Sequence, residues 1–328
     1  MENIIKKITK KVKSKLLLRK LDKCLLAENV ASCFQYIYAN DEKFKATLLE
    51  IIPEIDACMK QEQHTPWHVY DVWNHTLHSI EEMNEQTQNL DEKTRKLLAY
   101  VMFFHDIGKP ATVGRRMVKD YEYWDTFHGH EQVSAEIARR VCKDFGFSEQ
   151  EIAIIEKLIL EHDIFLSVKD SENPPEENDD WIQLTPEWIE EKVEELNAYG
   201  NGETLFSYLL LIGKADNLAQ NQQLSIQNIK VEEKVMQMFV KIKKKKQEEI
   251  LAEKAREEAE RAKLEAEAQQ LSQTSEQSES GQAENETAQP AEQPTETPAE
   301  AQTETSAQQP VESPAEQPAQ SENAQTNQ

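Results

Sequence analysis

The histidines of this sequence gather in one stretch of the chain. All eight lie within residues 64–162, although the chain has 328 residues. Four side chains in this stretch, His68, Asp71, His75 and His78, are spaced by three or four residues. Such spacing places them along one face of a helix, for which we expect a start at Thr65-Pro66. Imidazole and carboxylate groups gathered in this way bind metal ions or exchange protons.

A second apolar run ends in His105 and Asp106. Residues 100–110 read Tyr-Val-Met-Phe-Phe-His-Asp-Ile-Gly-Lys-Pro, so a core helix is followed at once by an imidazole, a carboxylate and two helix breakers. Burying such a pair is costly unless something satisfies both groups, and a divalent cation does so directly. The next charged residue, Lys109, is either a contact for a phosphate oxygen or an ordinary surface lysine.

Three further pieces carry the same residue types. They are Phe-His-Gly-His-Glu at 127–131, His162-Asp163 and Lys-Ala-Asp-Asn at 214–217. Each is weak alone, because a single His on an apolar face is more often a core residue than a ligand. Together they offer imidazole and carboxylate without thiolate. That donor set favours Mn²⁺, Fe²⁺, Co²⁺, Ni²⁺ or Mg²⁺ over a structural zinc ion.

The order His75, His105-Asp106, His130, His162, Asp216 resembles the HD superfamily of metal-dependent phosphohydrolases. More closely, residues 64–216 resemble the HD domain appended to bacterial tRNA nucleotidyltransferases, the CCA-adding enzymes. The shared pieces are His-Val-Tyr-Asp-Val-Trp-Asn-His-Thr, Phe-His-Asp-Ile-Gly-Lys-Pro, Phe-His-Gly-His-Glu, His-Asp and Lys-Ala-Asp-Asn-Leu-Ala-Gln. The resemblance spans roughly half of the chain. Residues 1–60 do not resemble the nucleotidyltransferase head, so CCA addition is not carried over.

The resemblance also implies roles for individual residues. The implied core metal ligands are His75, His105, Asp106 and Asp216, while His130 and His162 either complete a second metal site or contact the substrate phosphate. Asp106, His130 and Lys109 are the expected catalytic groups, and His68, His128 and Lys109 the expected substrate contacts. His64 and His78 are expected to be structural. Many binuclear members have adjacent histidines where this chain has His162-Asp163, which leaves the choice between one and two ions open.

These features predict a metal-dependent phosphohydrolase. A bound cation acidifies water and neutralises charge on a phosphoryl group. Asp106 would orient that water, and the leaving oxygen would be protonated by water or by an imidazole such as His130. The expected substrate is a nucleotide or an RNA end, as a phosphomonoester or a 2′,3′-cyclic phosphodiester. Two alternatives are a catalytically weak HD-fold module that binds RNA or a nucleotide, and a membrane-surface adaptor. The complete set of ligand types favours the enzyme.

The elements that must position these groups are helices. Apolar residues recur at helical spacing, and no segment indicates a strand, so we expect an all-α bundle of the HD type over residues 27–229. Helix starts are predicted at Thr65-Pro66, at Ser148 with Glu151 as a capping box, and at Thr185-Pro186. The expected helices are 66–84, 92–106, 130–145, 149–162, 186–197 and 203–219. Residues 167–183 are expected to form a polar surface loop near the site.

Residues 1–26 form a basic amphipathic helix in this interpretation. The first twenty residues hold eight Lys or Arg against one Glu, and Ile4, Ile5, Ile8, Val12 and Leu16 recur at helical spacing. The apolar stripe would pack on the domain or on a partner. The other interpretation is a contact with RNA or with an anionic membrane.

The C-terminal part of the chain differs in composition from the rest. Residues 230–270 predict an exposed charged helical spacer, and residues 271–328 a disordered tail rich in Gln, Glu, Pro and Ala, whose partner is not predicted. Residues 264–328 contain 13 Glu and no Lys, Arg or Asp, so the net charge of −24 becomes −11 without them (−24 + 13). The four cysteines show no metal or disulfide spacing, and no signal peptide or membrane span is evident. A cytoplasmic protein, in one version peripheral at the membrane, is therefore expected.

Overall fold

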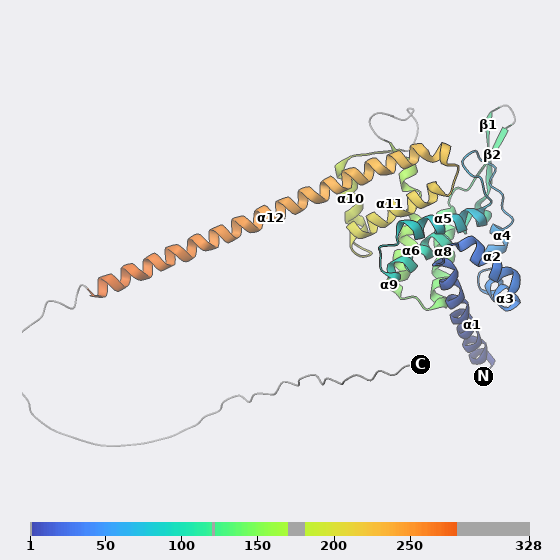
Figure 1. Cartoon of the computed structure of the whole chain (residues 1–328), viewed down its shortest axis with the longest axis horizontal. Coiled ribbons are helices and arrows are strands. Elements are labelled where there is room, and N and C mark those ends of the chain that lie inside the picture. The colour runs from blue at the N-terminus through green and yellow to red at the C-terminus, as the bar shows by residue number, and fades with distance from the viewer. Residues whose placement is uncertain (1, 120–121, 170–180, 281–328) are drawn as a thin grey trace, which may run out of the picture. The chain divides into compact units, whose positions relative to one another are not determined.

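A computed structural model describes residues 2–119, 122–169 and 181–280 of the chain (Figure 1). Their regular secondary structure is helical apart from short strands, which confirms the predicted all-α class. The helices are α1 (Glu2–Leu25), α2 (Val30–Asn40), α3 (Glu42–Ile51), α4 (Glu54–Cys58), α5 (Val72–Gln86), α6 (Glu92–Phe104), α7 (Lys109–Thr112), α8 (His130–Phe145), α9 (Glu149–Leu160), α10 (Pro186–Leu196), α11 (Gly202–Leu218) and α12 (Gln222–Ser280).

The chain divides into two compact units, which meet within α12 between Glu257 and Glu258. In the first unit, α5, α6, α8, α9 and α11 pack on one another around a single hydrophobic core (Figure 1). Helix α6 is central, since residues 98–104 are buried on every side. A helix that is apolar all round must lie inside the protein. The predicted ligands His105 and Asp106 follow it directly and are therefore held deep in the unit.

Two of the predicted helix starts are confirmed. The Ser148 side chain accepts a hydrogen bond from the Glu151 amide while the Glu151 carboxylate accepts one from the Ser148 amide, a complete capping box for α9. Thr185 caps α10 by accepting from the Trp188 amide, with Pro186 in the first turn. Each such cap stabilises a helix by about 1 kcal/mol.

The predicted start at Thr65-Pro66 is wrong. Helix α5 begins at Val72, because the Asp71 carboxylate accepts a hydrogen bond of 2.8 Å from the Asn74 amide and acts as its N-cap. The amide of Val72 donates 3.0 Å to the carbonyl of Gln61, closing a loop ahead of the helix. His68 therefore lies on this loop, and the four spaced residues do not share one helix face.

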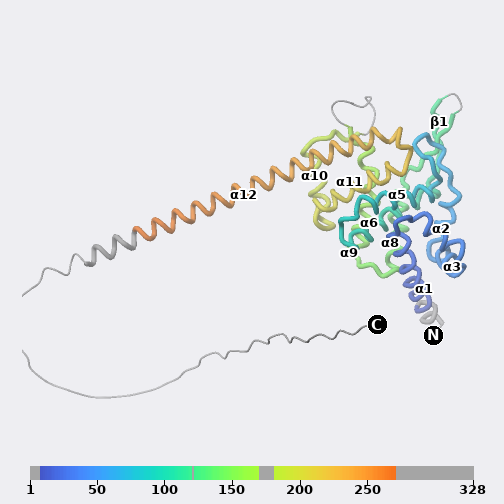
Figure 2. The backbone as a smooth tube through the Cα atoms, in the orientation of Figure 1, coloured from blue at the N-terminus to red at the C-terminus, as the bar shows by residue number. Residues whose placement is uncertain are grey.

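The structure contains a β-hairpin that the sequence did not indicate. Strand β1 (Gly114–Lys119) pairs antiparallel with β2 (Glu122–Thr126), and the hairpin extends past the helices (Figures 1 and 2). Its β-branched and aromatic residues are interrupted by charges, and β1 is almost wholly exposed, so no alternation of apolar and polar positions marks it. A second, parallel pair joins β3 (Val168–Lys169) to β4 (Ile182–Gln183). Most of the loop predicted between them lies outside the described residues.

Helix α1 buries a different face from the one predicted. Leu17 and Leu21 are buried in the core, whereas Ile8, Val12 and Leu16 are 58 %, 54 % and 54 % exposed. The prediction that this apolar stripe packs on its own domain is therefore wrong for these three residues. The side chains of residues 4 and 5, also part of the predicted stripe, lie outside the described set.

Helix α12 begins eight residues before the expected start of the charged spacer. Its first turns belong to the core, with Val235 and Phe239 buried and the ring centroid of Phe239 4.8 Å from that of Phe206. From residue 243 to residue 270 its side chains are exposed, and ion pairs at i and i+4 follow one another along it. The helix continues to Ser280, and the rest of the predicted tail lies outside the described residues.

The structure also bears on the expected lack of a membrane span and on the four cysteines. None of the described helices is long and apolar enough to cross a membrane. The four cysteines are free thiols; the Sγ atoms of Cys24 and Cys33 lie 3.2 Å apart.

Candidate metal centre

Four predicted ligands converge from three helices. His75 comes from α5, His105 and Asp106 from the turn after α6, and Asp216 from α11; all four are buried, and one donor atom of each lies within 4.8 Å of the others. The Nε2 of His75 is 2.8 Å from Oδ1 of Asp216, and the Nε2 of His105 is 3.3 Å from that oxygen. We call these four residues the first ligand group.

Asp106 also belongs to a second ligand group, with His130 from the start of α8 and His162 from the turn after α9. Its Oδ2 faces the first group, 3.3 Å from Nε2 of His105. Its Oδ1 faces the second, 3.2 Å from Nε2 of His130 and 3.8 Å from Nε2 of His162. One carboxylate thus presents one oxygen to each group.

The orientation of three of the imidazoles is fixed by backbone carbonyls. The Nδ1 atoms of His105, His130 and His162 lie 2.6, 2.8 and 2.7 Å from the carbonyl three residues earlier in each case. A carbonyl only accepts, so Nδ1 carries the proton and Nε2 of each neutral ring presents a lone pair to the site. The Nε2 atoms of His130 and His162 are 3.2 Å apart. Two lone pairs at that distance repel unless a proton or a cation lies between them.

The residues present fit a divalent cation. Nε2 of His105 and both oxygens of Asp106 are buried and make no hydrogen bond of good geometry to any described residue, although ion-pair neighbours surround them. Polar atoms left in this way cost free energy unless a further partner binds them. Imidazole nitrogens and carboxylate oxygens are the donors that such a cation takes in mixed sites.

Neighbouring charges shift the pKa values of two ligands in the first ligand group. Burial raises the pKa of Asp106, but His105 and Lys109 outweigh burial and hold that pKa well below its usual range. Burial lowers the pKa of His105, yet Asp106 and Asp216 raise it to about 10. A proton on His105 thus compensates the buried carboxylates when no metal is bound. Because a ligating imidazole is neutral, cation binding releases this proton.

Lys109 is not a surface residue. It is 7 % exposed, and its Nζ lies 2.6 Å from Oδ2 of Asp106 and donates 3.1 Å to Oε1 of Gln63. Its Nζ is also 5.4 Å from the ring centroid of Phe127. The alternative of an ordinary surface lysine is therefore wrong. The ammonium group of Lys109 lies beside the Asp106 carboxylate, which both ligand groups share.

Gly108 allows the ligand-bearing turn to approach α8. A Cβ atom at this position would lie 2.5 Å from the carbonyl oxygen of His130 and 2.8 Å from the amide nitrogen of Ser134. Real Cβ contacts are never that short, so only glycine fits here. The amide of Gly108 donates 2.9 Å to the hydroxyl of Ser134, which fastens the turn to the second ligand group.

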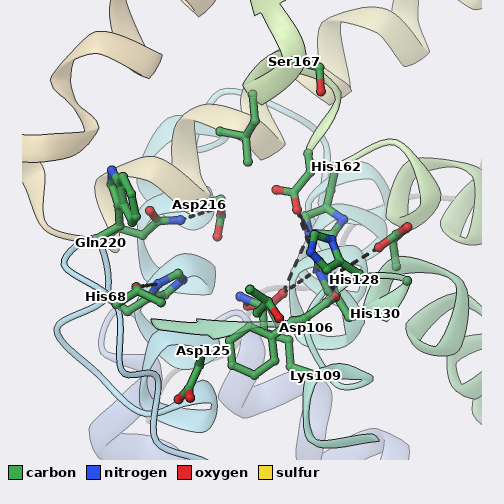
Figure 3. A pocket seen from close by; sticks show the side chains of 18 of the residues that line it. His68, Asp106, Lys109, Asp125, His128, His130, His162, Ser167, Asp216 and Gln220 are labelled. Carbon is green, nitrogen blue, oxygen red and sulfur yellow. Dashed lines mark hydrogen bonds and ion pairs between the residues drawn. The ribbon is translucent and has the colours of Figure 1, made fainter. Parts of the chain in front are cut away.

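A cavity of about 830 Å³ opens over the two ligand groups. Asp106, His130, His162 and Asp216 line it, while His75 and His105 lie behind them. Figure 3 shows Asp216 and His68 across the cavity from His130 and His162, with Asp106 and Lys109 between them. The ligand groups therefore form the floor of a space that a small molecule could enter.

The two predicted substrate-contact histidines also line this cavity. His68 is held by its Nδ1, 2.7 Å from the Thr65 hydroxyl, and its buried Nε2 has no hydrogen-bond partner among the described residues. Burial and the Lys109 charge lower the pKa of His68 to about 2, so the ring is neutral. His128 is exposed at the rim. The structural histidines lie elsewhere: His64 contacts Asp125, and His78 contacts Glu81.

Two residues of the site stand in the motifs quoted above but were given no role there. Asp163 lines the cavity with Oδ2 3.5 Å from Nε2 of His162, and Gln220 donates 2.9 Å to Oδ2 of Asp216. Asp163 directly follows a predicted ligand, and Gln220 lies one helical turn after another, so their spacing was an available signal. Outside the site, the buried Glu232 of α12 accepts 2.7 Å from Asn217, and no sequence signal marks it because it is one acidic residue in a charged helix.

Residues 68–220 match the family model of the HD domain. The match covers less than half of the chain, but it contains every predicted ligand and supports the expected relationship to the HD superfamily. Proteins of this family are in general metal-dependent phosphohydrolases, which agrees with a buried cluster of His and Asp that could hold a metal ion. No curated protein matches the chain. The narrower resemblance to CCA-adding enzymes therefore stays a prediction.

Proposed function

We propose that this chain is a metal-dependent phosphohydrolase that cleaves a phosphoester of a nucleotide or an RNA end. One observation carries the proposal: Asp106 presents one oxygen to each of two buried ligand groups on the floor of a cavity. A carboxylate in this position suits a pair of cations. Two ions side by side stabilise both the attacking and the leaving oxygen of a phosphoryl group.

Two sets of side chains would hold the two cations. His75, His105, Asp106 and Asp216 would hold one cation, and Asp106, His130 and His162 a second. When bound, the metal supplies an acidified water and neutralises charge on the phosphoryl oxygens. Lys109, fixed beside Asp106, adds a further positive charge at the position where phosphate oxygens would lie.

Proton donation to the leaving oxygen needs a group that is not a ligand. His130 was predicted for both roles, but its Nδ1 faces the carbonyl of Phe127 and its Nε2 faces Asp106. With a second cation bound, its Nε2 would have no proton to give. The proton would then come from water. The neutral His68, whose Nε2 is buried in the cavity wall without a partner among the described residues, is placed to form a hydrogen bond with the leaving group.

The size of the cavity supports a substrate of nucleotide size. About 830 Å³ lies within the range of small-molecule sites and exceeds what a bare phosphate requires. We therefore propose phosphomonoesters and 2′,3′-cyclic phosphodiesters of nucleosides, free or at an RNA end, as the substrate class.

The test combines metal content with hydrolysis. Purified full-length protein is loaded with Mn²⁺, Ni²⁺, Fe²⁺, Co²⁺ or Mg²⁺, its bound metal is measured by elemental analysis, and it is assayed on nucleoside monophosphates, 2′,3′-cyclic nucleotides and a short RNA. We expect bound metal and turnover in the wild type. His105→Ala should lower turnover by at least about a hundredfold.

His78→Gln is the matched control, since His78 contacts Glu81 and Tyr70 and lies outside the cavity lining. A wild-type protein that binds metal and nucleotide yet turns over none of these esters would be a binding module instead. A protein that takes up no metal at saturating concentrations would contradict both.

We also propose that α1 contacts an anionic membrane surface. Ile8, Val12 and Leu16 lie in line on its exposed side, and the exposed Lys11 and Lys15 flank them. An apolar stripe between basic residues inserts into the headgroup region of anionic lipid, whereas RNA would need only the charges.

Vesicle flotation distinguishes these partners. Wild-type protein should float with vesicles containing phosphatidylserine and not with neutral vesicles, and Val12→Glu should abolish flotation while leaving hydrolysis unchanged. If Val12→Glu floats like the wild type, the stripe has no role. If RNA instead binds equally to both proteins in a salt-dependent manner, RNA is the partner.

A further inference from the structure

The mouth of the cavity carries two tryptophans that the metal chemistry does not use. Trp67, from the loop before α5, and Trp124, from β2, both line the cavity with ring centroids 5.0 Å apart and planes at 87°. We call this pair the aromatic wall. Trp67 is 37 % exposed and Trp124 is half-buried. Large apolar rings in contact with solvent lack the favourable free energy of burial. A planar ligand that covered them would supply it.

The hairpin directs one of its faces into the cavity. Arg116 is paired with Trp124, and Gly114 with Thr126, so these four residues share a face. Arg116, Trp124 and Thr126 line the cavity. Arg116 is exposed and makes no ion pair with any residue that the structure describes. An unpaired guanidinium thus lies beside the aromatic wall.

The aromatic wall is held rigidly. The buried Asp125 carboxylate accepts 2.9 Å from the His64 amide and lies 2.8 Å from His64 Nδ1, and its own amide donates 3.1 Å to the His64 carbonyl. These bonds fasten β2 to the loop that carries Trp67. The amide of Asn221 donates 2.7 Å to the Trp67 carbonyl, which fastens the same loop to the segment after α11. The backbone segments that carry the two rings are therefore joined to each other and to the segment after α11.

We infer that the aromatic wall is a base-binding subsite, on which a nucleobase stacks while the phosphate of the same ligand lies at the ligand groups, and that Arg116 contacts a second phosphate. This inference rests on the proposed function, because it names the part of the substrate that the floor of the cavity does not recognise. An edge-to-face pair leaves at least one face of each ring uncovered by the other, so a flat base has a surface to stack on. Stacking on an aromatic ring tolerates any base, and arginine binds a phosphate with two parallel hydrogen bonds.

Binding is measured apart from turnover, so that the two proposals fail separately. Mn²⁺-loaded full-length protein is titrated calorimetrically with adenosine 5′-thiomonophosphate, a slowly hydrolysed analogue, and with inorganic phosphate. Trp124→Leu should weaken binding of the nucleotide analogue by about tenfold or more, as expected for loss of one stacking ring. Binding of inorganic phosphate should stay within about twofold of the wild type, since phosphate does not reach the wall.

Two control variants test the geometry. Tyr123→Leu removes an exposed aromatic from the neighbouring position of β2, whose side chain leaves the opposite face of the strand, and should bind the analogue like the wild type. Trp124→Phe keeps a ring and should retain most of the affinity. For the second phosphate, Arg116→Gln should weaken binding of adenosine 5′-thiodiphosphate more than that of the thiomonophosphate. Arg139→Gln, which removes an exposed arginine of α8 that pairs with Glu156 outside the cavity lining, should not.

The outcomes separate cleanly. Equal nucleotide affinity of Trp124→Leu and Tyr123→Leu overturns the base-binding subsite, even if the protein hydrolyses phosphoesters. If Trp124→Leu weakens the binding of nucleotide and of inorganic phosphate equally, the subsite is overturned too. The ring would then affect binding only through the ligand groups on the cavity floor. Should Trp124→Leu fail to fold, Trp67→Leu and the retained affinity of Trp124→Phe decide the question. Failure of the wild type to hydrolyse any ester would count against the proposed function, and the binding data would still decide the subsite.

Discussion

The floor and the rim of the cavity are built on different principles. The floor consists of buried ionisable side chains at the ends of core helices, where His105, Asp106 and Asp216 are each at most 6 % exposed. The rim consists of half-exposed rings and of Arg116, which has no ion-pair partner among the described residues, on a loop and a hairpin. Ionisable groups at the floor interact strongly because water is excluded, whereas the rim interacts through area and shape. The floor can therefore supply a reaction, and the rim can choose the molecule that undergoes it.

We expect the largest effect from a substitution of Asp106, the residue that both ligand groups of the floor share. Asp106→Ala should remove bound metal from both ligand groups, lower the melting temperature of the metal-loaded protein and abolish hydrolysis by at least about a hundredfold. His162→Ala should remove metal from the second group only, leaving one of the two ions that we propose for the wild type. Elemental analysis beside thermal unfolding measures this. Equal residual metal in the two variants would mean that Asp106 does not join the groups.

A smaller effect is expected at Lys109, which touches the floor without being a ligand. Lys109→Gln keeps a hydrogen-bonding side chain but removes the buried charge beside Asp106. Turnover should fall by about ten- to a hundredfold, since one charge-stabilising group is lost, while metal content stays at the wild-type value. Steady-state kinetics with parallel elemental analysis check it. Loss of metal in this variant would place Lys109 in the support of the ligand groups instead.

At the rim, the expected change is in affinity. Asp125→Asn weakens the bonds that hold β2 to the loop carrying Trp67, because an amide replaces an ionised carboxylate. Burial raises the pKa of Asp125, but its bonds with His64 lower it overall, so the carboxylate is ionised at neutral pH. We expect KM for nucleotides to rise by about threefold to tenfold with kcat nearly unchanged. A fall in kcat alone would show that the rim acts on the floor.

The pH dependence of stability tests a group outside both regions. Burial raises the pKa of Glu232 to about 8, its Oε2 has no hydrogen-bond partner among the described residues, and Oε1 accepts from Asn217. A carboxyl whose pKa is raised on folding stabilises fully below its unfolded pKa of about 4.3, and this contribution is lost as pH rises toward 8. Glu232→Gln should therefore gain melting temperature relative to the wild type between pH 5 and pH 8, by about 2–4 °C for each kcal/mol that the wild type loses. A constant difference across that range would contradict the shift.

The smallest effect is expected far from the cavity. Truncation after Lys263 removes a stretch that, as far as its side chains are described, is exposed and forms ion pairs along the helix. Such pairs contribute little to folding. The melting temperature should stay within about 1 °C and hydrolysis should be unchanged. A clear drop in either would assign the C-terminal segment a part in the first unit.

Floor and rim also differ in what the sequence could predict. The ligands were found because imidazole and carboxylate side chains at helix ends are rare and follow a known order, and the helices because apolar spacing and caps such as Ser148 are local signals. The true start of α5 was missed because Asp71 and Thr65 are both suitable caps, and a long-range bond from Val72 to Gln61 decides between them. Trp67 and Trp124 come from segments 57 residues apart, and nothing local pairs them.

Gly108 sets a condition on how this chain can change over time. Because a Cβ atom there would meet the backbone of α8 at His130, the turn bearing His105 and Asp106 cannot shift without displacing the second ligand group. A change in the position of that turn should therefore disturb both ligand groups at once. The outer part of the hairpin has no such constraint, since β1 is exposed along almost its whole length. Descendants of this sequence should accordingly vary at positions 117–119 while the turn at 105–109 stays the same.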